Sequence, residues 1–177
     1  LPAAGGEPAK NIGQLIDEAM DAVMKANPTL QGTLPRLYNK DNIDQRRLGE
    51  LIDLFNSARF SRQGDGRARD LMGEGYEYFL GNFARAEGTR GGEFFTPPSL
   101  VRMIVGGIEP DHGLVLDPAC GSAGMFVQTG HFIEDVRHRQ ANDTVTFHGQ
   151  EKSDTNTRLA RMNLVVHGLD ASNIRQG

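Results

Sequence analysis

The segment best suited to chemistry is residues 115–126, VLDPACGSAGMF, which joins an apolar strand to a helix through an acidic turn of small residues. Asp117 is expected to bring a carboxylate to the carboxyl edge of a sheet, while Gly121 and Gly124 let the backbone pass close to a ligand. The helix expected from about Ser122 would point its free N–H groups into the same crevice. This arrangement indicates a nucleotide-cofactor site, although such turns also use glycine for packing alone.

A second acidic residue is placed to share that crevice. Residues 144–148 form a predicted strand that ends at Gly149-Gln150-Glu151, and Glu151 follows Asp117 by 34 residues (151 minus 117). This interval suits a right-handed crossover between parallel strands through one helix. In dinucleotide-type folds an acid at the end of the second strand accepts hydrogen bonds from ribose hydroxyls. Glu151 is therefore predicted to bind a ribose, and the alternative is an ordinary exposed loop carboxylate.

A third candidate segment, residues 92–97 (GEFFTP), precedes the first strand. Its two aromatic side chains either line the crevice or pack as a hydrophobic staple against the helix that follows. Thr96 is expected to cap this helix, with Pro97 as its first residue. The buried face of the helix would carry Leu100, Val101 and Ile104.

The ligand class follows from what the sequence holds and lacks. It contains no Gly-x-x-x-x-Gly-Lys-Ser/Thr phosphate loop, and Asp117-Pro118 stands where a dinucleotide fingerprint has Gly-x-Gly. An acid there repels a pyrophosphate but attracts a positive group, such as the amino group or sulfonium of S-adenosylmethionine. The single cysteine, Cys120, is expected to be a small buried hydrophobe, because one cysteine forms neither an internal disulfide nor a multi-cysteine zinc site. No metal site is predicted.

The first half of the chain is predicted to be helical. After a flexible tail at residues 1–9, a helical domain is expected over residues 10–91. Its first helix ends at Pro28, a loop at residues 61–66 breaks the second, and the third is expected to bury its aromatic face in the core. The apolar residues that define these helices are Ile12, Leu15, Ile16, Ala19 and Val23, then Leu48, Leu51, Ile52 and Phe55, then Met72, Tyr76, Phe79, Leu80 and Phe83.

Residues 92–177 are predicted to begin an α/β domain of short strands alternating with helices. A helix over about residues 123–138 follows the first strand. After the second strand, Asp154 is expected to cap a helix that ends at Gly168 and buries Leu159, Met162 and Val166. Only two strands are expected, fewer than the five or six of an ordinary sheet. The chain is therefore expected to be an excerpt of a longer protein, and its start at Leu1 agrees with this.

The composition is that of a globular protein outside the membrane class. Hydrophobic residues make up 38% and charged residues 24%, and no apolar run approaches the roughly 18 residues that span a bilayer. The start also lacks a basic region followed by an apolar signal core, so a cytoplasmic location is expected. The net charge of −4 argues against unaided clamping of DNA. A local basic cluster, or else a solvated loop, comprises Arg59, Arg62, Arg67 and Arg69.

Four ordered motifs resemble the modification subunits of bacterial type I restriction-modification systems, which are adenine-N6 DNA methyltransferases. The motifs are GEFFTP at residues 92–97, DPACGSAG at 117–124, GQE at 149–151 and NLVVHG at 163–168. The resemblance covers at least residues 70–170, and the helical part before it is similar to that family's N-terminal domain. It implies that the chain holds the first part of a Rossmann-like methyltransferase domain that uses S-adenosylmethionine.

The resemblance also implies roles for the site residues. The Phe-Thr-Pro segment and the acidic turn would hold the methionine end of S-adenosylmethionine, and the acid of Gly-Gln-Glu would hold its ribose. Ala123 departs from the family, because many members have glycine there. The implied cofactor-binding residues are Glu93, Phe94, Phe95, Thr96, Pro97, Asp117, Ala119, Cys120, Gly121, Ser122, Ala123, Gly124 and Glu151.

The larger departure is that the family's catalytic Asn-Pro-Pro-Phe/Tyr tetrapeptide is absent from these 177 residues. Adenine N6 is a poor nucleophile, so hydrogen-bond acceptors must orient its amino group after the base has left the duplex. No catalytic residue is therefore assigned, and the chain alone is expected to be inactive.

The resemblance further implies that the parent protein acts on DNA with two partners, a specificity subunit that reads the sequence and a restriction subunit that is motor and nuclease. Two alternatives stay open. One is a methyltransferase that uses S-adenosylmethionine but acts on protein or a small molecule. The other is a truncated, non-catalytic module that binds other subunits.

Overall fold

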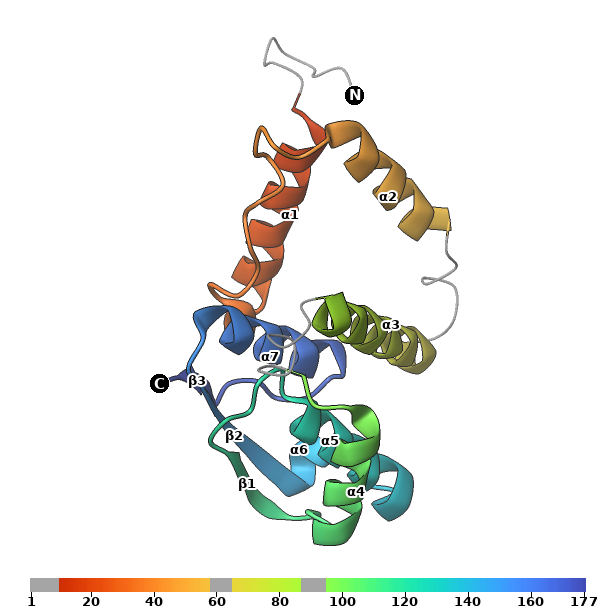
Figure 1. The fold of residues 1–177 in the computed structure, drawn as a ribbon, viewed down its shortest axis with the longest axis vertical. Helices are drawn as coiled ribbons and strands as arrows, with labels where there is room; N and C mark the ends of the chain where they lie inside the picture. The colour runs from red at the N-terminus through yellow and green to blue at the C-terminus, as the bar shows by residue number, and fades with distance from the viewer. Residues whose placement is uncertain (1–9, 58–64, 87–94) are drawn as a thin grey trace. The chain divides into compact units, whose positions relative to one another are not determined.

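The computed structural model describes residues 10–57, 65–86 and 95–177 of the chain. It divides into two compact units, Leu1–Gln63 and Gly64–Gly177, whose elements are labelled in Figure 1. The sequence predicts a helical domain over residues 10–91, whereas the structure groups the third helix of that segment with the second unit. All the described residues of the candidate site therefore belong to the second unit, together with that helix. The basic cluster at residues 59–69 lies outside the residues whose side chains are described.

The first unit contains two helices joined by a structured loop. α1 (Ile12–Ala26) begins with a capping box, in which the N–H of Gln14 donates to Oδ1 of Asn11 and the N–H of Asn11 donates to Oε1 of Gln14. A short 3-10 turn, η1 (Pro28–Leu30), follows, and α2 (Gln45–Ser57) comes next. Both helices lie where the apolar spacing predicts, and α1 ends before the proline as expected.

The second unit begins with α3 (Asp65–Ala86), whose large apolar residues differ from prediction. Met72, Phe79 and Phe83 are 59%, 51% and 64% exposed, so the prediction that they lie in the core is wrong. Because α3 begins at Asp65, the loop predicted for residues 61–66 is also wrong at its last two positions. Residues 61–64 lie outside the described part of the chain.

α3 buries Leu80, as predicted, together with small residues that allow close approach of the neighbouring elements. A Cβ added to Gly81 would lie 3.3 Å from the ring of Phe95, so glycine leaves the space that this aromatic ring fills. The hydroxyl of Tyr76 donates to the carbonyl of Leu159 at 3.3 Å, and burial raises the pKa of this tyrosine to about 12. Among residues 72–86 of α3, whose side chains are described, the buried ones are Gly73, Leu80, Gly81 and Ala84.

Gly73→Ala is expected to lower the free energy of unfolding by about 1–3 kcal/mol, because the new methyl group would lie 2.7 Å from Nε2 of His167. The ring of His167 is 6% exposed and its Nδ1 lies 2.8 Å from the carbonyl oxygen of Asn163, so it cannot easily move aside. Gly75→Ala is the matched control in the same helix, since nothing lies within 4 Å of its Cβ. Urea unfolding followed by circular dichroism compares the two variants, and equal stabilities would contradict this packing.

The sheet has three parallel strands in the order β1-β2-β3. They are β1 (Gly113–Asp117), β2 (Val145–Glu151) and β3 (Ile174–Gln176). Asp117 is aligned with Gly149, so Glu151 extends beyond this pair at the carboxyl edge. The first two strands lie where the sequence predicts, but the expectation of only two strands is wrong. β3 is too short for periodicity to reveal it, although its Ile174 is completely buried.

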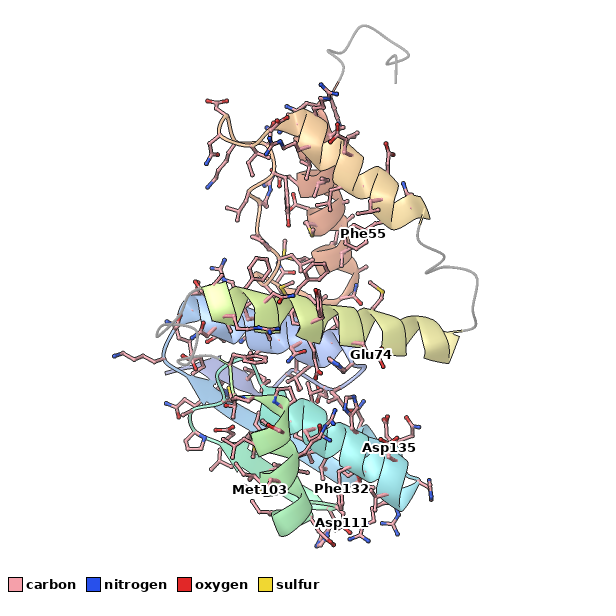
Figure 2. All side chains as sticks on the ribbon, turned by 45° about the vertical axis from the view of Figure 1, so that its right-hand side comes forward. Phe55, Glu74, Met103, Asp111, Phe132 and Asp135 are labelled. Carbon is pink, nitrogen blue, oxygen red and sulfur yellow. The ribbon has the colours of Figure 1, made fainter. Side chains whose placement is uncertain are left out.

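α5 (Gly124–Arg137) and α7 (Asp154–Val166) share one hydrophobic core with the sheet. α4 (Pro98–Ile108) lies against α5, and α6 (Ala141–Thr144) leads into β2. Leu114 and Leu116 are exposed on the face of β1 that points away from this core. Met103 of α4 and Asp135 of α5, which are labelled in Figure 2, are also exposed. None of the described helices is long and apolar enough to cross a bilayer. Large side chains of this core include Phe126, Ile133, Phe147, Leu164, Leu169 and Ile174.

α4 begins one residue later than predicted. Pro97 is its N-cap and Pro98 its first residue, and no side chain caps it, so the predicted capping role of Thr96 is wrong. The cause is the second proline, since a residue that precedes proline avoids the helical conformation. Val101 is buried as predicted, but Leu100 is 43% exposed and Val105 takes its place in the core.

α7 differs from prediction in its cap and in its buried face. Oγ of Ser153, rather than the side chain of Asp154, accepts the N–H of Asn156 at 3.4 Å. Gly168, in a left-handed conformation, follows the end of the helix as predicted. Leu159, Met162 and Val166 are only half-buried, and the buried residues are Thr157, Ala160, Asn163 and Leu164. Apolar spacing misses this face because two of its four residues are polar.

Candidate cofactor-binding site

The turn between β1 and α5 is held by short hydrogen bonds. Oδ1 of Asp117 accepts the N–H of Ala119 at 3.0 Å, which closes the first bend after the strand. The N–H of Cys120 donates to the carbonyl of Gln150 at 3.0 Å and ties the turn to β2. Two of the predicted site segments, residues 117–124 and 149–151, are therefore in direct contact.

Two residues of this turn have left-handed backbone angles. Gly121 has φ 54° and Ala123 has φ 66°. For alanine this conformation costs about 1–2 kcal/mol, which is a physical reason for glycine to be favoured here. Ala123 is also the N-cap of α5 and supplies no capping side chain. The positive end of the α5 dipole therefore lies at the turn without a side-chain acceptor on it.

Glu151 is held rigidly at the end of β2. Its side chain accepts the N–H of Gly121 on Oε2 at 3.1 Å and the N–H of Ser153 on Oε1 at 2.9 Å. Nδ2 of Asn156 lies 3.5 Å from Oε1, and the residue is only 8% exposed. A carboxylate has about four lone-pair positions, so these contacts leave capacity for a further donor. The alternative of an ordinary exposed loop carboxylate is excluded.

Six of the described site residues border three separate hollows. Phe95, Thr96, Ser122 and Gly124 border a small cavity of about 30 Å³. Pro97 and Phe95 border a wider groove of about 760 Å³. Asp117 borders a third hollow of about 450 Å³ with residues of α4 and α5. Glu151 borders none of these hollows and is linked to the site by its hydrogen bond to Gly121. Glu93 and Phe94 lie outside the described residues.

Cys120 is the small buried hydrophobe that the sequence predicts. It is 6% exposed and lies in the main core. Burial, reinforced by the negative charges of Asp117 and Glu151, raises the pKa of its thiol to about 12. The thiol is therefore neutral throughout the physiological pH range, and the two carboxylates act on it from the turn and from β2.

Cys120 is expected to react with thiol reagents about 100-fold or more slowly in the native protein than in the unfolded chain, because the thiolate is the nucleophile and its formation is suppressed. Cys120 is the only cysteine of the chain, so modification by a chromogenic disulfide with and without urea reports on this residue alone. Equal rates in the two conditions would show that the turn is open.

Three polar residues that line the small cavity were not predicted from the sequence as site residues. They are Glu77 of α3, Gln128 of α5 and Asn163 of α7. Asn163 opens the NLVVHG motif, so a polar residue on the buried face of a helix was the available signal. Glu77 and Gln128 carried none, because only tertiary packing brings α3 and α5 to the turn. Among the described residues no group of acidic, cysteine or histidine side chains could hold a metal ion.

Comparisons with known proteins identify the family of the chain. A family model described as N-6 DNA Methylase matches residues 67–177. The HindI methylase subunit of a type I restriction enzyme from Haemophilus influenzae is 42% identical over 165 residues, which covers 90% of this chain and 37% of that protein. The MjaIX methylase subunit from Methanocaldococcus jannaschii is 35% identical over 161 residues, covering 90% of this chain and 28% of that protein. The chain thus spans about a third of the length of these curated relatives.

A solved structure is similar over nearly the whole chain. It is the methyltransferase subunit of a type I restriction-modification system from Streptococcus thermophilus, with a TM-score of 0.65, 20% identity, and coverage of 93% of this chain and 34% of that one. This likeness confirms the predicted fold class, an α/β methyltransferase fold preceded by helices. With the family match extending over almost all of the second unit, the chain belongs to the N-6 DNA methylase family and is related to the methylase subunits of type I restriction enzymes.

Proposed function

We propose that this chain is part of a DNA adenine-N6 methyltransferase that uses S-adenosylmethionine and works within a type I restriction-modification system. The observation that carries the proposal is the contact between Glu151 and Gly121, which joins the acidic end of β2 to the turn after β1. Such a joined edge of parallel strands is where nucleotide cofactors bind in open α/β sheets. The family to which the chain belongs supports a methyl donor of this type.

The donor set suits the cofactor. S-adenosylmethionine supplies an activated methyl group on a positively charged sulfur. The residues proposed to hold its methionine end are Phe95, Thr96, Pro97, Asp117 and the turn from Ala119 to Gly124, with Glu93 and Phe94 assigned to the same end. The carboxylate of Asp117 suits a cationic ligand. Glu151 accepts a ribose hydroxyl on its remaining lone pair, and its bonds to Gly121 and Ser153 keep it from turning away.

The proposed acceptor is an adenine turned out of duplex DNA, because its N6 atom is otherwise buried in base pairing and stacking. The net charge of −4 fits a division of labour in which a specificity subunit supplies most contacts to DNA and a restriction subunit supplies cleavage. Orientation of the adenine amino group is assigned to parts of the methylase polypeptide other than these residues, since no Asn-Pro-Pro-Phe/Tyr tetrapeptide occurs among them.

Methyl transfer tests this proposal. The methylase polypeptide with its specificity subunit is incubated with unmethylated DNA and S-adenosylmethionine labelled in the methyl group, and the DNA is then digested to nucleosides. The expected result is label in N6-methyl-2′-deoxyadenosine. Label in protein but not in DNA would favour the alternative acceptor, and no transfer combined with no cofactor binding would favour the structural module.

A further inference from the structure

A buried amide beside the turn has one hydrogen-bonding atom unused. Asn163 is 1% exposed, and its Nδ2 donates to the carbonyl oxygen of Ser122 at 2.8 Å. Because only the amino side of the amide can donate to a carbonyl, Oδ1 is the atom left over. Oδ1 has no hydrogen-bond partner among the described residues. Buried acceptors without partners are rare in folded proteins, so this one indicates a donor that lies outside the described residues, such as a ligand in the adjoining cavity.

The space next to Asn163 has the size of a small head group. Asn163 borders the cavity of about 30 Å³ together with Thr96 and Ser122. This volume holds a water-sized group but no nucleoside. The wider groove of about 760 Å³ shares Glu77, Phe95 and Pro98 with this cavity. A ligand in the groove can therefore place a single small group in the cavity.

The charges around the two spaces favour a cation in the cavity. Glu77 borders both spaces, and its carboxylate, 37% exposed, lies 3.8 Å from Nε2 of His167. Arg85, Arg102 and Glu74 border only the wider groove, whereas Glu77 is the charged residue that lines the cavity. A group with hydrogen-bond donors and a positive charge is thus attracted to the cavity, while the groove offers two arginines with which a carboxylate can pair.

We propose that Asn163 and Glu77 form a subsite for the charged amino group at the methionine end of S-adenosylmethionine. Asn163 then acts with both ends of its amide: Nδ2 holds the carbonyl of Ser122 in the turn, and Oδ1 accepts a hydrogen bond from the amino group. This inference rests on the proposed cofactor function. It assigns a binding role to a residue of α7, a helix that otherwise serves the core.

Three adenosine probes test the subsite in binding titrations with the methylase polypeptide. S-adenosylhomocysteine carries the amino and the carboxyl group, its decarboxylated form keeps only the amino group, and 5′-methylthioadenosine has neither. Asn163→Leu is expected to lower the affinity for the two amino-bearing probes by about tenfold or more relative to the affinity for 5′-methylthioadenosine, because a hydrogen bond to a charged group is lost. If the substitution only disturbed the turn, it would instead lower the affinity for all three probes equally.

Two further variants keep the outcomes separable. Asn163→Asp retains an acceptor, so it is expected to keep the preference for amino-bearing probes even where the lost bond to Ser122 weakens all of them. Thr157→Val, at a buried position of the same helix, is expected to leave the preference unchanged. The inference is overturned if Asn163→Leu keeps the wild-type preference or Asn163→Asp loses it. Failure of the wild-type protein to bind S-adenosylhomocysteine at all would overturn the proposed function as well, which distinguishes the two failures.

Discussion

Glu151→Ala lowers the affinity for S-adenosylmethionine by about 10- to 100-fold, because a hydrogen bond between a hydroxyl and a charged carboxylate contributes roughly 1.5–3 kcal/mol. The same substitution leaves the N–H groups of Gly121 and Ser153 without their acceptor. The turn is therefore expected to loosen too, which adds to the loss of binding. Titration calorimetry measures the affinity, at a temperature where circular dichroism shows that the variant is folded.

Glu134→Ala is the matched control for this prediction. Glu134 is an exposed glutamate of α5 in the same unit, so its removal changes the net charge equally without touching the turn. Binding by Glu134→Ala is expected to equal that of the wild type. If Glu151→Ala is folded and binds within about twofold of the wild type, well below the tenfold loss expected for a lost charged hydrogen bond, Glu151 does not contact the cofactor.

Phe126→Ala lowers the free energy of unfolding of the second unit by about 3–5 kcal/mol, the range for truncating a fully buried aromatic side chain. Phe126 is 0% exposed, and its ring lies 5.0 Å from that of Phe147, measured between centroids. A Cβ added to Gly149 would lie 2.9 Å from Cε2 of Phe126, so the sheet fits closely around this ring. The neighbouring residues are packed too tightly to move into the cavity that truncation leaves. Urea unfolding followed by circular dichroism measures the loss.

Phe83→Ala is the matched control, because Phe83 is 64% exposed on α3. It is expected to change stability by no more than about 0.5 kcal/mol. Equal losses from the two substitutions would mean that the aromatic face of α3 is buried in solution and that the helix packs differently from the structure.

Local signals predicted the parts of the fold that are close in sequence. The strand ending at Asp117, the turn to Gly124 and the helix after it follow one another directly, so apolar runs, glycines and an acid were sufficient. Glu151 was also predicted, because a crossover of one helix brings the next parallel strand to the same edge. Its ribose-binding role stays a prediction, which the calorimetric experiment tests.

Other features depend on tertiary packing, which periodicity does not contain. β3 has only three residues, and Ile174 is the buried one among them. α3 was expected to bury its aromatic side, yet it buries the side with Gly73, which faces His167 at the end of α7, and Gly81, which faces Phe95. Asn163 interrupts an apolar pattern because a carbonyl of the turn requires a donor from the core. In each case a neighbour far along the chain decides which face is buried.

The joined ends of β1 and β2 are proposed to bind S-adenosylmethionine. Calorimetric titration of the folded protein with S-adenosylmethionine tests it most directly. The expected result is saturable binding of one molecule per chain, which S-adenosylhomocysteine displaces. A folded protein that shows neither heat of binding nor retention of labelled cofactor in equilibrium dialysis would contradict the claim.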